Sequence, residues 1–207
     1  MGPGDFIPLA EYLGLITDIG DYILEEACRQ CKKWNDAGYT NFHVNVNLSV
    51  VQLLQKNVAE NINNIIRKSG VNPANIVLEI TESFAINDMD RVLNIINGVK
   101  KLGPRIALDD FGTGYSSLAY LKDIPADTLK IDKTFVDSIG KEQKSDMIIN
   151  SIVELMRNLG LEIIAEGVET KEQFEILKKL QCHDIQGFLL GKPMSSKDAL
   201  DVIKTRK

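Results

Sequence analysis

The chain has 207 residues, of which 44% are hydrophobic and 26% are charged; this composition excludes a disordered or collagen-like segment and fits one packed domain. A formal net charge of −5 argues against a DNA-binding or RNA-binding protein, because such proteins need a basic face toward the phosphates. No apolar run reaches the roughly 18 residues of a membrane span, and the start lacks the pattern of a signal peptide. We therefore expect a chain without direct membrane contact. Its three cysteines, Cys28, Cys31 and Cys182, are an odd number that does not suggest a disulfide framework, so we expect a reducing cytoplasm, whether or not a larger parent protein is anchored in a membrane.

Helical sequence comes first along the chain, from about Pro8 to Trp34, and Gly14 and Gly20 are expected to interrupt it. Strand signals then recur at regular intervals. In the clearest of them, apolar residues alternate strictly with His43, Asn45 and Asn47. The six predicted strands are Phe42–Leu48, Ile76–Ile80, Arg105–Asp109, Thr128–Ile131, Glu162–Ala165 and Ile185–Leu190.

Amphipathic helix patterns lie between these strands, and their ends carry recognisable signals. Three of them stop at a glycine: Val50–Ser69, Asp90–Leu102 and Lys144–Leu159. Thr170 and Gln173 form a capping box for a further helix that runs to Leu180. Strands that alternate with helices predict parallel strands joined by right-handed crossovers, in either a doubly wound sheet or a barrel.

Polar side chains stand at the carboxyl end of every predicted strand. They recur at separations between 20 residues (166 to 186) and 36 residues (130 to 166), about one strand-helix unit each, so they are expected to meet at one face. Any one of them alone could be a helix cap, a loop residue or a surface charge. The residues concerned are Asn47, Glu79, Asp109 with Asp110, Lys130 with Asp132, Glu166 with Glu169, and Gln186.

The adjacent carboxylates Asp109 and Asp110 indicate a cation, because they repel each other unless a positive charge neutralises them. Asn, Asp and Glu oxygens suit Mg²⁺ or Mn²⁺. Zinc is disfavoured: the Cys-x-x-Cys pair Cys28 and Cys31 falls in a predicted helix and is expected to pack there. His43 and His183 follow no ligand spacing and are interpreted as structural.

A glycine-rich turn follows this acidic pair directly, in the segment from Asp109 to Leu118. Gly112 and Gly114 allow backbone torsions with which the turn can fold over a ligand or a metal site. The segment matches neither a dinucleotide-binding fingerprint nor a P-loop. Its Asp-Phe-Gly stands without the other kinase motifs, so it does not indicate a kinase.

Taken together, these motifs resemble one family, the EAL domain, a phosphodiesterase that hydrolyses cyclic di-GMP to the linear dinucleotide pGpG. The family is a TIM-type (β/α) barrel. The resemblance spans nearly the whole chain, in the family's order. It is carried by Phe6-Ile7-Pro8-Leu9-Ala10-Glu11, Val46-Asn47-Leu48-Ser49, Leu78-Glu79-Ile80-Thr81-Glu82, the segment Asp109 to Leu118, Leu129-Lys130-Ile131-Asp132, Ala165-Glu166-Gly167-Val168-Glu169-Thr170, and Gln186-Gly187-Phe188 leading to Lys192-Pro193.

The resemblance implies a role for each matching residue. Lys130 and Glu166 match residues that orient and deprotonate the attacking water, and Gln186 matches a polar residue near the substrate. Glu82, with Gly112 and Gly114, matches residues that shape the loop after Asp109. The matches to ligands of a two-metal Mg²⁺ or Mn²⁺ site are Asn47, Glu79, Asp109 and Asp110.

One departure from the family concerns the motif that gives it its name. The sequence contains no Glu-Ala-Leu, whose glutamate is a metal ligand in the family. We interpret residues 1–5 as a leader or tag remnant and residues 6–207 as an EAL-type domain that lacks its first two strands. This predicts an incomplete barrel with about six of the eight strands, and little or no activity of the chain by itself.

Two alternatives to an active phosphodiesterase stay open on the sequence. The first is a binding module that senses cyclic di-GMP without cleaving it. The second is a Mg²⁺ barrel enzyme that acts on a carboxylate substrate, because acids and a lysine at strand ends also serve enolate chemistry. A barrel without two strands leaves two unpaired sheet edges, so we also expect a homo-oligomer.

Overall fold

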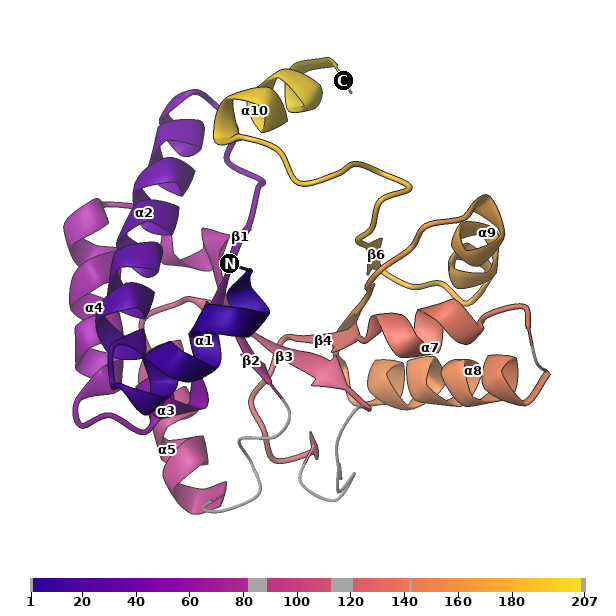
Figure 1. The fold of residues 1–207 in the computed structure, drawn as a ribbon, viewed down its shortest axis with the longest axis horizontal. Helices are drawn as coiled ribbons and strands as arrows, with labels where there is room; N and C mark the ends of the chain where they lie inside the picture. The colour runs from indigo at the N-terminus through magenta and orange to yellow at the C-terminus, as the bar shows by residue number, and fades with distance from the viewer. Residues whose placement is uncertain (1, 82–88, 113–120, 142, 206–207) are drawn as a thin grey trace.

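The protein is described here by a computed structural model, which covers residues 2–81, 89–112, 121–141 and 143–205 (Figure 1). Six parallel strands form one sheet, in which they follow each other in chain order. Helices lie in four of the five crossovers, as the alternating pattern predicts; the fifth, between β3 and β4, lies largely outside the described residues. The strands are β1 (Val44–Leu48), β2 (Ile76–Thr81), β3 (Arg105–Phe111), β4 (Thr128–Ile131), β5 (Glu162–Ala165) and β6 (Asp184–Ile185).

The sheet curves, and most helices lie around its outer side, whereas α1 (Pro3–Tyr12) lies in front of the strands in the view of Figure 1. Within the described ranges, β1 and β6 each pair with one neighbour only, so the barrel is incomplete. This confirms the predicted fold class. The helices are α1 (Pro3–Tyr12), α2 (Ile16–Asp36), α3 (Val50–Leu53), α4 (Val58–Ser69), the 3-10 turn η1 (Pro73–Asn75), α5 (Met89–Lys100), α7 (Lys133–Ser138), α8 (Gln143–Asn158), α9 (Lys171–Lys179) and α10 (Ser196–Thr205).

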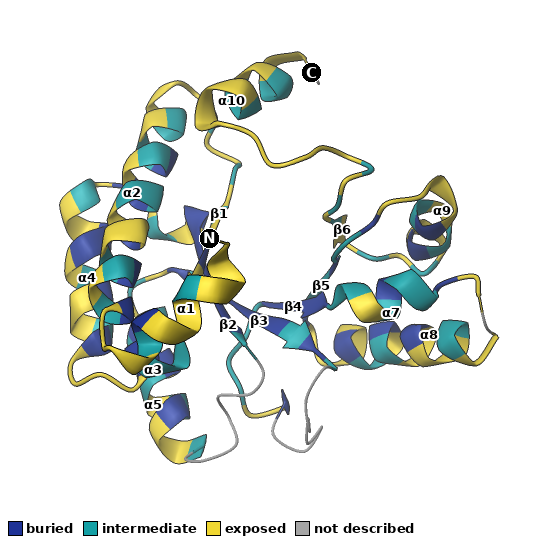
Figure 2. Cartoon of the chain, viewed as in Figure 1, coloured by how far each residue is buried: buried dark blue, intermediate teal, exposed yellow. Residues whose placement is uncertain are grey.

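The hydrophobic core lies between the outer face of the sheet and the helices (Figure 2). Alternate strand residues such as Val46 and Leu78 are buried there, and they pair with each other across β1 and β2. Helix residues such as Leu24 and Ile62 are buried with them. Because side chains alternate along a strand, this core fixes which residues face the other side of the sheet.

Five of the six predicted strands are confirmed with ends shifted by no more than two residues, but the sixth is wrong beyond Ile185. The chain turns back after Gln186, and the amides of Leu190 and Gly191 donate to the carbonyl of Gly187. Gly187 passes so close to the Val168 backbone that a β-carbon there would overlap it. This contact and the turn end β6 early.

Two helix predictions are also wrong. Gly20 lies inside α2 rather than at a break, because the amide of Gln52 occupies the space that a β-carbon at Gly20 would need. The single helix predicted over Val50–Ser69 is two helices, α3 and α4, since Asn57 between them adopts a left-handed backbone with φ of 66°. The break near Gly14 is confirmed, at φ of 73°.

Several predicted local roles are confirmed. Thr170 and Gln173 form the capping box of α9. Cys28 and Cys31 are fully buried in α2, as packing residues. His183 is structural, because its Nδ1 accepts a hydrogen bond from the amide of Ile163. No described helix has the length and apolar character that crossing a membrane requires.

Candidate active site

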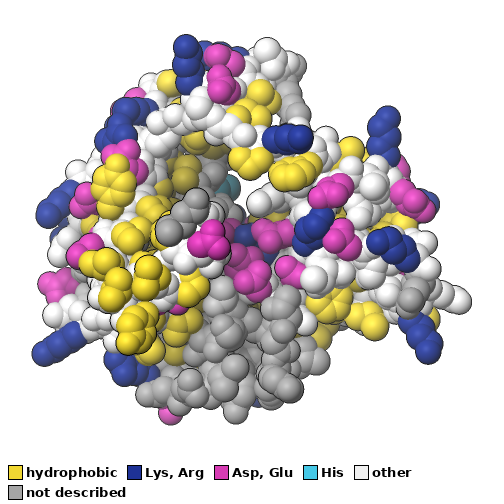
Figure 3. All heavy atoms as spheres, in the orientation of Figure 1, with side chains coloured by type: hydrophobic (Ala, Val, Ile, Leu, Met, Phe, Trp, Pro, Cys, Tyr) yellow, Lys and Arg dark blue, Asp and Glu magenta, His cyan; other side chains and the backbone are white. Residues whose placement is uncertain are grey.

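A polar hollow of about 670 Å³ opens at the carboxyl ends of the strands. Acidic side chains gather around the opening in the middle of the face shown in Figure 3. Six of the residues singled out from the sequence contribute to the wall of the hollow, although they come from six different strands or strand ends. The lining residues are Trp34, His43, Val44, Asn45, Asn47, Glu79, Asp109, Lys130, Glu166 and Gln186.

The alternation of the strands explains why these side chains share one hollow. Asn47 and Glu79 are register partners in β1 and β2, and each is flanked by residues buried in the core. Lys130 pairs with Ile164 in β5, which places Glu166 on the same side two residues later. Parallel register therefore brings residues that are far apart in sequence to the inner face at one end of the sheet.

Lys130 is the centre of the site. Its side chain is only 5% exposed, and its ammonium lies 2.7 Å from Oε1 of Glu79, 3.1 Å from Oδ1 of Asp109 and 2.6 Å from Oε1 of Glu166. A buried ammonium is stable only when such partners surround it. One cation thus ties together the ends of β2, β3 and β5.

The electrostatics of this cluster are dominated by its excess of carboxylates. Burial works to lower the pKa of Lys130, but Glu79, Glu166 and Asp109 outweigh it and hold the pKa above its usual range. Burial raises the pKa of Glu166, and Asp109 and Glu79 add to this against the opposing effect of Lys130. Burial and the neighbouring Asp109 likewise raise the pKa of Asp110. Three carboxylates contact one ammonium, so the site attracts further positive charge.

A bulge in β3 presents the two adjacent aspartates. Leu108 pairs with Leu129 and Phe111 pairs with Ile131, so Asp109 and Asp110 together stand opposite the single residue Lys130. Asp110 has a left-handed backbone with φ of 56°, and its amide donates to Oδ1 of Asp109 at 3.0 Å. Asp109 lines the hollow, whereas Asp110 is not one of the described residues that line it.

The loop residues singled out from the sequence are only partly described. Gly112 has φ of 96°, and a β-carbon there would overlap the ring of Phe135, so the turn after β3 requires glycine at this position. Glu82 and Gly114 lie outside the described residues. Asp132 and Glu169 have structural partners: Asp132 caps α7 through the amide of Thr134, and Glu169 pairs with Lys133 at 2.6 Å.

Four lining residues were missed as site residues by the sequence reasoning: Trp34, His43, Val44 and Asn45. Trp34 and His43 belong to the wall of the hollow near the edge of β1. Asn45 donates from Nδ2 to Oε1 of Glu79 at 2.7 Å. The strict alternation of β1 was the signal for Asn45, because it places Asn45 on the same face as Asn47.

The described oxygen donors of the hollow fit a divalent metal, although they do not yet surround a common point. Among the residues that the structure describes, no three acidic, histidine or cysteine side chains already surround a common point, and the ammonium of Lys130 lies between the carboxylates instead. The oxygens available still suit a hard cation. The contacts to Lys130 use Oε1 of Glu79 and Oδ1 of Asp109, which leaves Oε2 and Oδ2 for a ligand. Asn47 adds an exposed amide beside them.

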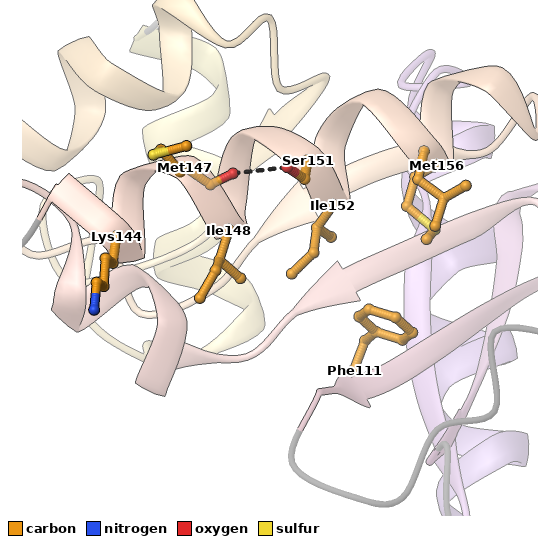
Figure 4. A pocket seen from close by; sticks show the side chains of 8 residues that line it. Phe111, Lys144, Met147, Ile148, Ser151, Ile152 and Met156 are labelled. Atoms are coloured by element: carbon orange, nitrogen blue, oxygen red, sulfur yellow. Dashed lines mark hydrogen bonds between the residues drawn. The ribbon is translucent and has the colours of Figure 1, made fainter.

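A second hollow, of about 510 Å³, lies along α8 and offers no such chemistry (Figure 4). Its wall is mostly apolar, with Phe111, Ile148 and Ile152 pointing into it. The hydroxyl of Ser151 donates to the carbonyl of Met147 within the helix at 2.9 Å. The polar hollow at the strand ends is therefore the better candidate for an active site.

Comparison with solved structures supports the assignment of the fold. The structure entitled "PaMucR Phosphodiesterase, c-di-GMP complex" is 44% identical, superimposes with a TM-score of 0.92, and matches 96% of this chain and 81% of that one. A calcium and cyclic di-GMP complex of BlrP1 from Klebsiella pneumoniae is 25% identical with a TM-score of 0.73, over 84% of this chain and 43% of that one.

Sequence comparison identifies the family. The chain is 44% identical over 198 residues to MucR of Pseudomonas aeruginosa, which is named a bifunctional diguanylate cyclase and cyclic di-GMP phosphodiesterase. The match covers 96% of this chain but 29% of MucR, so the chain spans less than a third of that relative's length. The family model of the EAL domain matches residues 1–193 of this chain. The resemblance read from the motifs is thus confirmed, and the chain belongs to the EAL domain family.

Proposed function

We propose that the natural protein containing this chain hydrolyses cyclic di-GMP to linear pGpG, with Mg²⁺ or Mn²⁺ bound at the strand-end hollow. The observation that carries the proposal is the buried contact of Lys130 with Glu79, Asp109 and Glu166. It combines in one cavity a cation for the phosphate, ligands for a metal and a base for water. The phosphodiesterase name and the cyclic di-GMP complex of MucR support the choice of substrate.

We assign the metal-binding role to oxygen donors at the ends of β1, β2 and β3: Asn47, Glu79, Asp109 and Asp110. When bound, a pair of divalent ions lowers the pKa of an attacking water and neutralises the charge that grows on the phosphate. The calcium in the BlrP1 complex supports a divalent ion in such a hollow. A cation would also explain how an acidic chain attracts a dinucleotide with two phosphates.

The chain's own residues supply orientation and proton transfer. Lys130 holds Glu166 at 2.6 Å and can donate to the attacking water or to a phosphate oxygen. Glu166 accepts the proton of that water, for which a pKa raised by burial is useful because the base must hold a proton after the transfer. Gln186, at the end of β6, contributes an amide that can bind the substrate.

The loop after β3 has a positioning role in this proposal. Gly112 allows the sharp turn at the end of the strand, and Glu82 and Gly114 are proposed to shape the same loop. We further propose that residues 6–207 belong to the phosphodiesterase domain. Because the sequence lacks Glu-Ala-Leu, we expect the chain alone to hydrolyse cyclic di-GMP slowly or not at all.

The test is hydrolysis of cyclic di-GMP by the whole natural protein, with Mn²⁺ and then with EDTA, and with pGpG quantified by chromatography. Formation of pGpG that requires Mn²⁺ supports the proposal. Absence of pGpG in a clean preparation with intact Asn47, Glu79, Asp109 and Lys130 would refute it.

A sensor that binds cyclic di-GMP without cleaving it is the second candidate. It is favoured by the absence of Glu-Ala-Leu and by Lys130 lying at the point between the carboxylates. Calorimetry distinguishes the two candidates, because a sensor binds the nucleotide in EDTA whereas the phosphodiesterase site requires the metal for tight binding.

A further inference from the structure

We infer that Asn45 is a positioning residue, which holds the carboxylate of Glu79 so that Oε2 is presented to the metal. The inference rests on the proposed function, since it concerns the metal ligand Glu79. Its basis is a single contact between neighbouring strands: Nδ2 of Asn45 lies 2.7 Å from Oε1 of Glu79.

The position of Asn45 in β1 explains this contact. Asn45 lies two residues before Asn47 in β1, so both side chains face the hollow. The register partner of Asn45 in β2 is Val77, and the register partner of Asn47 is Glu79. The Asn45 side chain therefore reaches along the strands to the next inward-facing residue of β2. Glu79 is 4% exposed, so few groups other than its protein neighbours can hold its carboxylate.

The chemistry of the two groups fixes the direction of the hydrogen bond. An ionised carboxylate only accepts, so Asn45 must present its NH₂ group to Oε1. The ammonium of Lys130 approaches the same oxygen at 2.7 Å from the other side of the site, on β4. Two donors from different strands on one oxygen restrict rotation of the carboxylate, and Oε2 is left as the ligand oxygen.

The exposed position of Asn45 makes it possible to distinguish the positioning of Glu79 from a contribution to the stability of the fold. Asn45 is exposed in the hollow and adds nothing to the hydrophobic core, so its removal should change the free energy of unfolding little. By contrast, removal of a residue that orients a metal ligand lowers the metal affinity by about 10-fold to 100-fold. A change in metal affinity without a change in stability is therefore the signature of the proposed role.

Two substitutions distinguish positioning from direct ligation. Asn45→Ala removes the side chain. Asn45→Asp keeps its size but replaces the donor by an acceptor that repels Glu79. A direct metal ligand would tolerate or profit from Asp, because carboxylates bind Mn²⁺ at least as well as amides do. A positioning donor would be lost in both variants.

The experiment is a Mn²⁺ titration followed by electron paramagnetic resonance on the 207-residue chain. We expect Asn45→Ala and Asn45→Asp to bind Mn²⁺ about 10-fold more weakly than the unsubstituted chain, and the melting temperature of Asn45→Ala in EDTA to be unchanged. Asn97→Ala, an exposed asparagine of α5, is the matched control and should bind as the unsubstituted chain does. In the natural protein, Asn45→Ala should raise the Mn²⁺ concentration needed for half-maximal hydrolysis and leave the KM for cyclic di-GMP unchanged.

Failure of the inference and failure of the proposed function give different results. Unchanged Mn²⁺ affinity in Asn45→Ala, or equal or tighter binding in Asn45→Asp, would overturn the positioning role while the metal site stands. Absence of Mn²⁺ binding by both the unsubstituted chain and the natural protein would remove the metal site itself, and the role of Asn45 with it.

Discussion

The ammonium of Lys130 lies 2.7 Å from Oε1 of Glu79, although the two residues belong to β4 and β2, which are separated by β3 in the sheet. Such a contact is possible because the sheet curves and both side chains point to its inner face. Lys130 reaches Asp109 and Glu166 as well, so one buried charge joins four consecutive strands or strand ends. The consequences can be tested on stability, metal binding and catalysis.

Removal of the Lys130 charge should destabilise the protein in a pH-dependent way. In Lys130→Met, carboxylates around the site repel each other without a counter-charge, and breaking a buried ion pair costs about 3 to 5 kcal/mol. Protonation of the carboxylates relieves the repulsion, so the loss in melting temperature should shrink as pH falls from 8 to 5. Thermal melts in EDTA measure this, with the exposed Lys144→Met as control. An equal loss at both pH values would contradict the electrostatic explanation.

Divalent metal should stabilise the folded chain through the aspartates of the β3 bulge. A ligand that binds only the native state at 100 times its Kd adds about 2.7 kcal/mol, and EDTA should reverse the gain. Asp109→Asn and Asp110→Asn should reduce the rise in melting temperature with Mn²⁺. Asp123→Asn, in an exposed turn, is the matched control and should keep the full rise. A full rise in Asp109→Asn would exclude this site as the source of the effect.

The pH dependence of hydrolysis should report Glu166. Burial raises the pKa of its carboxyl against the effect of Lys130, and the base acts only when deprotonated. The kcat of the natural protein should therefore fall as pH falls through a pKa above the ordinary carboxyl value. Glu166→Gln should lower kcat by about 10²-fold to 10⁴-fold and abolish this acidic limb. An unchanged acidic limb in the variant would assign the titration to another group.

The cysteine thiols, buried at Cys28 and Cys31 and partly exposed at Cys182, should be inert near neutral pH. Burial raises the pKa of Cys28 and of Cys182 to about 11, and that of Cys31 also lies above its ordinary value. Ellman's reagent should therefore label them only after unfolding. Because the folded thiols hold their protons between pH 9 and 11 while unfolded thiols lose them, stability should be complete below pH 9 and fall as pH rises to 11. Rapid labelling of the native chain at pH 8 would contradict this.

Self-association is expected from the open sheet. Among the described strands, β1 has one unpaired edge, and side chains such as Tyr12 and Leu13 on the neighbouring helical segment are 87% and 56% exposed. Light scattering should give a mass that rises above one chain with concentration. A single monomeric mass at all concentrations would show that the exposed edge is protected in another way.

Much of the fold and of the site could be predicted from the periodicity of the apolar residues and from the spacing of the polar residues at strand ends. Alternation identified β1, and the recurrence of polar residues at strand ends placed Glu79, Asp109, Lys130 and Glu166 at one hollow. These features are encoded locally, because a strand with one buried face has only one way to orient its other face. The family resemblance then supplied the roles, which the experiments above test.

The parts that sequence reasoning missed depend on contacts between distant segments. Gly20 lies inside a helix because Gln52 packs against it, and no signal near Gly20 indicates this. The early end of β6 depends on Gly187 meeting the Val168 backbone. The role of Asn45 required the distance to Glu79, because alternation alone gives the face of a side chain and not its partner.

The central claim is that the carboxylates around Lys130 form a metal-dependent phosphodiesterase site, and one measurement tests it most directly. Cyclic di-GMP is incubated with the whole natural protein and Mn²⁺, in the unsubstituted form and as Glu79→Gln, and pGpG is quantified over time. The account predicts pGpG from the unsubstituted protein and a loss of activity of about 100-fold or more in the variant. No pGpG from the unsubstituted protein, or equal rates in the two, would contradict it.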